Sequence, residues 1–426
     1  MDIHHNLAGP GRRVMVERAD HSRLVYERGR RGFIAHPYAF RGHEFARRAY
    51  YYHGRPYNRF YNPYFYHGVH MEVYAPYRYY PVGFYGWAYN PWAAPVAYGW
   101  GWGPSPWYGY YGAYFTPYPV YTSPSLWLTD YMIADSLQAN YEAATAAGPP
   151  PPMAADAAPL TPEVKQLVAN EVQRQIALEN SEAQMNAQGQ VPDPASSGIQ
   201  RMLTDGQPHA FIAGSEVDVV DSTGQECAVT DGDVLSLTAP PAPDATEAQV
   251  TVLSSKGGKE CRKMAVVSVP IEDLQEMQNH MRETVDQGLA ELQSKQGSNG
   301  LPPAPPSAKV APVEAAFAAQ APPPEPDGEK ELQAQAQLAD QSEAELNREA
   351  SAAGGPAASA PEAAPVAAPA PAAAPVSVDI QPGQSLASVK AALGEPVRIV
   401  NLGPKTIYVY KDMKVTFTAG KVTNIE

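Results

Sequence analysis

Cysteine is scarce in this sequence of 426 residues, which contains only Cys227 and Cys261. The two residues form no CxxC motif, so the sequence supports neither a thioredoxin-like redox site nor a zinc site with thiolate ligands. Both lie in one stretch of short apolar runs, and we expect a disulfide between them. Such a bond would close a loop of about 34 residues and stabilise a small core. The alternative is a pair of half-buried thiols.

Lysine is absent from the first 130 residues, and acidic residues are few there. This part carries 13 arginines and seven acids, which gives it a charge of about +6. Because the net charge of the whole chain is −14, the remaining residues carry about −20. All six tryptophans and 22 of the 26 tyrosines also lie in it. The composition therefore divides the chain into a basic, aromatic part and a longer acidic part.

Charge is absent altogether from residues 79–129. Eight prolines interrupt this segment, so it lacks the roughly 20 continuous apolar residues of a membrane-spanning helix. Three interpretations remain: a coil packed over the preceding sheet, a self-associating or wall-facing surface, and seating at a lipid interface. The side chains that would make such contacts are Trp87, Trp92, Trp100, Trp102, Trp107 and Tyr110.

An export signal is missing from the first residues, which have neither a basic start nor an apolar core. A disulfide nevertheless favours an oxidising compartment. We therefore expect that an export signal lies upstream of Met1, which gives a periplasmic or cell-envelope location. The alternative is that Met1 is the true start, which gives a cytoplasmic protein with reduced cysteines.

Glycines follow aromatic and basic residues at regular intervals within residues 1–78. Gly29, Gly42, Gly54 and Gly68 are 13, 12 and 14 residues apart, a spacing that predicts successive hairpins in a β-meander. Interleaved Arg and Tyr side chains are also compatible with nucleic-acid binding through phosphate contact and base stacking. A solvated basic sheet is the simpler interpretation.

The longest stretch with the pattern of an ordinary folded protein is 206–293. Short β-type runs with turn signals between them predict a small barrel or sandwich. Apolar residues at helical spacing after Pro270 predict an amphipathic helix that covers it.

Helix and linker signals flank this central module. Thr161 as N-cap predicts an amphipathic helix over 161–186, with Leu167 in its apolar stripe. The aromatic region that begins with the uncharged segment spans 79–142, and a short helix up to Tyr141 closes it. Proline- and alanine-rich composition predicts a linker at 143–160 and a disordered tether at 294–376.

The C-terminal residues 377–426 predict a second small module, in which a helix capped by Ser385 and ended by Gly394 precedes three or four strands. The turn and core positions of this module are Gly383, Ser385, Val389, Leu393, Gly394, Pro396, Tyr408, Tyr410, Val415, Phe417, Gly420, Lys421 and Val422. Over about 45 of the 426 residues this pattern resembles SmpA/OmlA, a small domain of outer-membrane-assembly lipoproteins. The lipobox cysteine of that family is absent here.

The resemblance implies an α-β-β-β fold and an envelope adaptor that touches other proteins. The layout as a whole is also similar to uncharacterised exported bacterial proteins. The fold class expected for the entire chain is mainly β with some α.

Catalytic motifs are missing too: a nucleophile elbow, a P-loop, a Rossmann glycine set and HExxH do not occur. The histidine pairs His67/His70 and His43/His53 have only a loose metal-like spacing, so we expect no metal and no cofactor. We therefore expect a non-catalytic cell-envelope protein with a structural or adaptor role.

The expected partners are envelope proteins or cell-wall material, and self-association is compatible with the aromatic segment. The alternatives are nucleic-acid binding through the N-terminal sheet and peripheral membrane attachment through the aromatic segment.

Overall fold

The computed structural model describes residues 2–5, 7, 12–27, 32–52, 55–146, 148–150, 152–353, 380–381, 384–394, 396, 398–402, 405–410, 413–418 and 421–425. Of the described residues, 37% are helical and 27% lie in strands, so the protein is a mixed α/β chain. The expectation of a mainly β fold is not confirmed, because long helices follow the N-terminal sheet.

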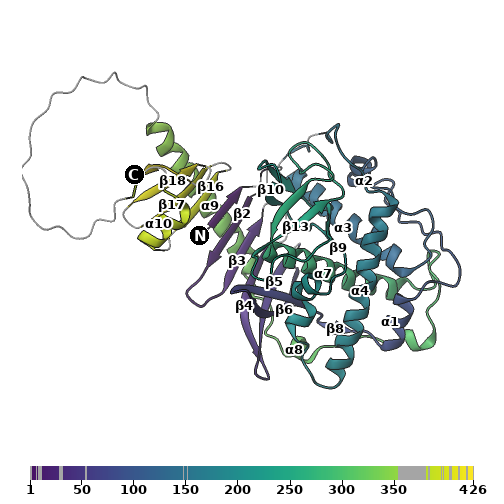
Figure 1. The fold of residues 1–426 in the computed structure, drawn as a ribbon. Coiled ribbons are helices and arrows are strands. Elements are labelled where there is room, and N and C mark those ends of the chain that lie inside the picture. The colour runs from purple at the N-terminus through teal and green to yellow at the C-terminus, as the bar shows by residue number, and fades with distance from the viewer. Residues whose placement is uncertain are drawn as a thin grey trace, which may run out of the picture.

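Seven N-terminal strands form an antiparallel meander in chain order (Figure 1). They are β1 (Asp2–His5), β2 (Arg12–Glu17), β3 (Arg23–Glu27), β4 (Phe33–Phe40), β5 (His43–Tyr52), β6 (Arg55–Tyr66) and β7 (Val69–Ala75). Gly42 and Gly68 occupy the turns before β5 and β7 with φ of 81° and 82°, the backbone region that a tight hairpin reserves for glycine. Gly29 and Gly54 lie outside the described residues.

The meander is strongly curled between β3 and β7. Arg23 on β3 forms an ion pair with Glu72 on β7. Four strand spacings separate these strands in the sheet, so a flat sheet would hold them roughly 19 Å apart. The contact therefore requires the sheet to fold back on itself like part of a barrel, which gives it a concave inner face.

The uncharged segment folds into the core instead of forming a surface coil. Phe84, Tyr85, Phe115 and Trp127 are fully buried and belong to one hydrophobic cluster with side chains of the sheet and of five helices. The helices of this layer are α1 (Val82–Tyr89), α2 (Pro106–Tyr111), α3 (Pro124–Ala146), α4 (Pro162–Ala187) and α7 (Ile271–Lys295). The aromatic segment thus shares one core with the sheet and the helices, while the central module and the C-terminal elements have clusters of their own.

One buried carboxylate organises this layer. Asp130 on α3 accepts hydrogen bonds from the backbone N–H of Tyr118 (2.6 Å), the hydroxyl of Tyr121 (2.7 Å) and Nζ of Lys165 on α4 (2.8 Å). Trp100 in turn donates to the Tyr121 hydroxyl at 2.6 Å. Burial raises the pKa of Asp130, and the Lys165 ammonium opposes that rise. Because a buried charge must be paired and hydrogen-bonded, this network fixes the aromatic segment against both helices.

The start of α4 follows the prediction, since the Thr161 hydroxyl accepts a hydrogen bond from the N–H of Val164. The predicted apolar stripe is correct except at Leu167, which is 40% exposed. The buried face runs instead through Lys165 and Ala169, because Lys165 is drawn to Asp130.

Six antiparallel strands build the central module in the order β11-β10-β14-β13-β12-β9. They are β9 (His209–Ile212), β10 (Val217–Asp221), β11 (Glu226–Val229), β12 (Val234–Leu237), β13 (Glu247–Val252) and β14 (Val266–Pro270), and α5 (Pro194–Ser197) and α6 (Ile199–Thr204) precede them. Ile271, Leu274 and Met277 of α7 pack into the same cluster as the inner residues of the strands. Cys227 and Cys261 are joined in this module with an S–S distance of 2.08 Å.

Residues 294–353 were expected to be part of a disordered tether, but they lie against the folded body. The elements are η1 (Pro306–Ala308), β15 (Val313–Glu314), α8 (Ala316–Ala319) and α9 (Gly328–Ala353), and β15 pairs with β8 (Arg78–Tyr79). Phe317 is buried and stacks on Phe45 with centroids 4.6 Å apart. Leu332 of α9 is buried against the outer face of the meander. A few apolar anchors therefore hold a proline-rich segment whose composition alone predicts disorder. Residues 354–376 of the expected tether lie outside the described residues.

The linker expected at 143–160 is also partly ordered. Ala158 and Ser255 exchange backbone hydrogen bonds of 2.7 and 3.2 Å, which places this segment over a loop of the central module.

The C-terminal elements are α10 (Leu386–Leu393), β16 (Arg398–Leu402), β17 (Lys405–Val409), β18 (Lys414–Thr418) and β19 (Lys421–Ile425). The hydroxyl of Ser385 accepts from the N–H of Ser388 at the start of α10, and Gly394 has a φ of 80° at its end. Val389 packs with Val415 and Phe417 in a small separate cluster. β16 pairs in parallel with β1, so the four C-terminal strands extend the meander.

Removing the disulfide is expected to destabilise the protein. The Cys227→Ser/Cys261→Ser variant should lose about 3–4 kcal/mol of unfolding free energy, because the cross-link closes a loop of 34 residues. Urea unfolding followed by circular dichroism, with and without reductant, measures this loss. Reductant should lower the stability of the wild-type protein and leave the variant unchanged; equal sensitivity of both would contradict the prediction.

Candidate functional site

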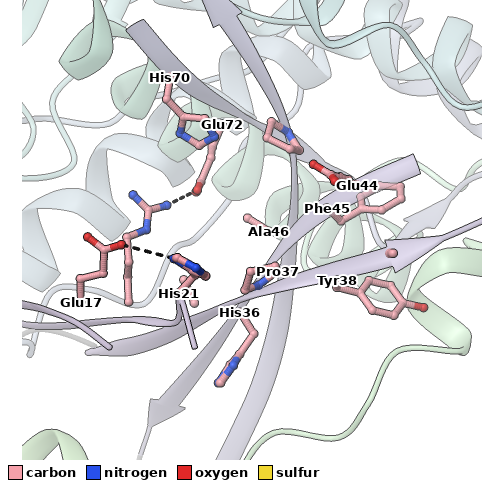
Figure 2. A pocket seen from close by; sticks show the side chains of 14 residues that line it. Glu17, His21, His36, Pro37, Tyr38, Glu44, Phe45, Ala46, His70 and Glu72 are labelled. Carbon is pink, nitrogen blue, oxygen red and sulfur yellow. Dashed lines mark hydrogen bonds and ion pairs between the residues drawn. The ribbon is translucent and has the colours of Figure 1, made fainter. Parts of the chain in front are cut away.

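A pocket of about 560 Å³ opens on the concave face of the meander (Figure 2). Its floor consists of small side chains on three neighbouring strands: Ala35, Pro37 and Ala39 of β4, Ala46 of β5 and Pro63 of β6. Pro37 lies directly opposite Ala46 in the strand register. Because none of these side chains reaches far from the backbone, the curl of the sheet leaves a hollow above them.

The wall of the pocket on the β2–β3 side carries Glu17, His21 and Arg23. His21 has a φ of 62° in a tight turn. The neighbouring Asp20 carboxylate fixes this turn by accepting hydrogen bonds from the hydroxyl and N–H of Ser22 at 2.7 and 3.0 Å. These two hydrogen bonds lower the pKa of Asp20. His21 Nδ1 lies 3.9 Å from a carboxylate oxygen of Glu17.

The lining also includes His70 and Glu72 of β7, which lie beside Arg23, and Glu44 of β5, which lies on the other side of the pocket (Figure 2). The His70 ring meets Phe65 edge-on, with centroids 5.5 Å apart. Within the described part of the chain, no three His, Cys, Asp or Glu side chains are grouped so as to hold a metal ion. Each histidine or carboxylate of the pocket can therefore form hydrogen bonds or ion pairs with a ligand individually.

Arg48 is paired with Glu72, which lines the pocket. Its guanidinium donates to Glu72 Oε2 at 2.7 and 3.2 Å and to both carboxylate oxygens of Glu276 on α7, and it lies 3.8 Å from the centroid of the Tyr61 ring. Burial acts to lower the pKa of Arg48, but the nearby Glu276, Tyr61 and Glu72 outweigh it and the net pKa is raised. Burial likewise acts to raise the pKa of Glu276, and Arg48 reverses this to a lowered value.

The polar face of α7 continues this pairing along the sheet. This face begins at Glu276 and continues at the positions three, seven and ten residues later, which are Asn279, Glu283 and Asp286. Such spacings place these side chains on one side of the helix. Their sheet partners are Arg48, Arg59 at 3.8 Å from Glu283, and Arg78 at 3.8 Å from Asp286. The arginine-rich sheet therefore finds its counter-charges inside the same chain.

Asn279 covers the edge of the meander. Its Oδ1 accepts from the N–H of Tyr74 at 2.8 Å, and its Nδ2 donates to the carbonyl of Glu72 at 2.7 Å. The side-chain amide thus reproduces the hydrogen bonds of another strand on β7, so the exposed edge that invites association is closed here.

A second group of buried acids lies behind this interface, between α4 and α7. Glu179 accepts from the Tyr85 hydroxyl at 2.7 Å, and Asp286 accepts from the Tyr74 hydroxyl at 3.1 Å. Burial raises the pKa of Glu179 well above its usual value, and the nearby Asp286 adds to this rise. The adjacent Glu182 is instead paired with Arg282 at 2.5 Å.

The aromatic residues proposed for partner contacts lie mainly within the fold. Trp92 and Trp107 are buried. Trp100 stacks on Trp102 and on Trp127, with centroids 4.2 and 4.7 Å apart. The remaining candidates, Trp87 and Tyr110, are half-buried against the same core.

Sequence reasoning did not identify the pocket residues. The available signal was weak: alanine and proline at alternate positions of β4, with histidine and acid residues near the hairpin turns. The curl that brings β3 and β7 together depends on contacts with α7. No local pattern in the N-terminal sequence predicts those contacts.

No protein-family model, no curated protein and no solved structure matches this chain, so the chemistry of the site itself has to indicate the function. Among the described residues, no helix combines the length and the apolar character that crossing a membrane requires.

Replacing Arg48 should strongly destabilise the protein. In Arg48→Met the buried Glu72 keeps only Arg23 as a partner, and breaking a buried ion pair from one side costs about 3–5 kcal/mol. Urea unfolding measures the loss, and Arg55→Met, at an exposed arginine of β6, is the control. The double variant Arg48→Met/Glu72→Gln should recover part of the loss. A cost equal to that of the control would contradict the buried pairing.

Glu179→Gln should stabilise the protein at neutral and higher pH. A carboxyl whose folded pKa is raised binds its proton more tightly in the native state, so stability falls as pH rises from the unfolded pKa of about 4.3 towards the folded pKa. The amide abolishes this fall and still accepts from Tyr85. Melting temperatures at acidic and alkaline pH should therefore differ less in the variant. Glu182→Gln, which removes the partner of Arg282, should destabilise at neutral pH; a stabilising effect of that control would contradict the assignment.

Proposed function

We propose that the protein is a non-catalytic component of the bacterial cell envelope that binds a partner protein through the pocket in its N-terminal sheet. The observation that carries this proposal is the preformed pocket of about 560 Å³. Strand pairing holds its floor, and the ion pairs of Arg23 and Arg48 with Glu72 hold its curl. A site on rigid strands keeps its shape without a ligand, which favours binding.

The charge balance of the pocket favours a cationic group. Arg23 is neutralised by Glu72, whereas Glu17 and Glu44 are exposed at opposite sides of the opening (Figure 2). His21 and His70 add ring nitrogens that accept hydrogen bonds when neutral. A concave surface with an excess of one charge concentrates the opposite charge. A lysine or arginine side chain of a partner protein has this chemistry.

Two further observations support the envelope location. The pairing of Cys227 with Cys261 is typical of proteins in oxidising compartments. The resemblance of residues 377–426 to SmpA/OmlA domains implies contact with other envelope proteins.

The alternative partners are less well supported. Nucleic-acid binding needs free basic groups, but Arg47, Arg48, Arg59 and Arg78 are paired with acids of residues 276–325. Membrane attachment through the aromatic segment needs exposed rings, and most of the tryptophans are packed in the core.

The binding proposal is tested with the full-length oxidised protein and Nα-acetyl-lysine N-methylamide as the probe. Saturation-transfer NMR should detect contact of the lysine methylenes with the protein. The signal should be lost in Glu17→Gln/Glu44→Gln and kept in Glu226→Gln, which changes an exposed acid on β11. The Nε-acetylated analogue, which carries no charge, should not bind. Equal binding of both probes, or unchanged binding to the double variant, would rule out the cationic site.

A further inference from the structure

A lysine lies between two carboxylates in the interior of the central module, away from the pocket. Lys256 Nζ donates to Asp233 Oδ1 and lies 3.4 Å from Glu260 Oε1. The three side chains are 8%, 2% and 8% exposed. The amine nitrogen therefore contacts a carboxyl group directly, with a second carboxylate beside it and almost no access for water.

Several backbone constraints hold these three groups in place. Asp233 precedes β12 and accepts from the N–H of Thr230 at 2.8 Å through its other oxygen. Glu260 accepts from the Thr230 hydroxyl at 2.6 Å. The neighbouring Cys261 ties the loop to Cys227 through the disulfide. The reacting groups are thus positioned by secondary structure and a cross-link and not by flexible side chains alone.

An aromatic residue from the uncharged segment closes the site. The hydroxyl of Tyr114 lies 3.2 Å from Asp233 Oδ1 and 3.0 Å from the hydroxyl of Ser254, and the Lys256 ammonium lies 5.2 Å from the centre of its ring. Asp156, from the segment that crosses the loop, accepts from the N–H of Gly258 at 3.1 Å. The amine and the acid are therefore enclosed from both sides.

We infer that Lys256 and Asp233 are joined by an intramolecular amide bond that forms spontaneously once the chain has folded, with Glu260 as the proton carrier. The reaction is a condensation of an ammonium and a carboxylate to an amide and one water molecule. It needs no oxidant, reductant or additional substrate.

Glu260 first carries one proton from the Lys256 ammonium to a carboxylate oxygen of Asp233, which leaves a free amine and a neutral acid. The amine attacks the carboxyl carbon of Asp233, so a C–N bond forms. Glu260 then takes a second proton from the nitrogen of the tetrahedral intermediate and delivers it to the hydroxyl group, the C–O bond breaks, and water leaves. The Tyr114 hydroxyl is placed to donate to the oxygen that becomes negative in the tetrahedral intermediate.

Three physical effects favour this reaction in the folded protein. Fixed contact between the amine and the acid supplies effective concentrations of roughly 10⁵–10⁸ M. Exclusion of water favours the neutral reactants over the ion pair and removes the hydrolytic competitor. Burial and the nearby Glu260 also raise the pKa of Asp233 to about 7, so its neutral acid form is populated near neutral pH. Burial acts to lower the pKa of Lys256, but Asp233 and Glu260 outweigh it and raise the net pKa, so the amine becomes free only when a carboxylate takes its proton.

The protein contains a natural comparison for this chemistry. Lys165 and Asp130 also form a buried pair, with Nζ and Oδ1 2.8 Å apart. The acceptors of Lys165 are Asp130 and the carbonyl of Thr116, and no second carboxylate shares this ammonium in the described contacts. We expect no amide at Lys165, because nothing there carries the proton from the amine to the leaving oxygen.

Intact mass spectrometry of the purified full-length protein, unfolded and reduced, tests the inference. The wild-type protein should be lighter than its sequence by one water molecule, not two. After denaturation and acetylation, Lys256 should stay unmodified, whereas Lys165 should be acetylated. In the unacetylated protein, trypsin should leave the Lys256–Gly257 bond uncut. A mass equal to that of the sequence, or acetylation at Lys256, would overturn the inference.

Two variants separate the chemistry from folding. Glu260→Gln keeps the amine and the acid but removes the proton carrier, so it should have the full sequence mass while retaining the wild-type circular dichroism spectrum. Glu247→Gln, at an exposed acid on β13 of the same module, should still lose one water molecule. Loss of water in a folded Glu260→Gln protein would exclude Glu260 as the carrier.

Discussion

The structure depends on the burial of opposite charges between the N-terminal sheet and α7. Arg48 and Arg59 lie opposite each other on β5 and β6 of the meander, Arg78 follows on β8, and the acids of α7 that pair with them repeat at the helical period. Neither surface is stable in the interior alone, because a buried charge without a partner is costly. The sheet can curl, and the pocket can exist, only when the helix lies across it. The basic N-terminal part and the acidic remainder of the sequence therefore form an interface with each other inside the protein.

The same rule explains how an uncharged, proline-rich segment becomes part of a core. The aromatic rings supply most of the buried surface, but their polar edges need partners. Asp130 provides an acceptor for Tyr121 and a counter-charge for Lys165, and Trp100 reaches it through Tyr121. One acidic residue at the end of the segment therefore fixes the positions of many rings. The tryptophans that looked like a contact surface serve mainly as packing.

Local patterns in the sequence predicted the elements better than their assembly. The hairpin spacing, the N-caps at Thr161 and Ser385 and the pairing of the cysteines follow from short-range chemistry, and the structure contains them. The placement of residues 294–353 did not follow, because Phe317 and Leu332 are isolated anchors in a composition typical of disorder. The pocket was also missed, since it arises from the curl between β3 and β7 and not from any motif.

The distance along the chain between the paired charges has a consequence for biogenesis. Arg48 and Glu276 are 228 residues apart, and contacts of such separation form late because the closure of long loops is slow. During synthesis, the arginine-rich strands emerge well before the helix that neutralises and covers them. The arginine-rich strands therefore lack their counter-charges until the acids of α7 are available. The curled sheet and its pocket can therefore form only late, once the segment that contains α7 has been made.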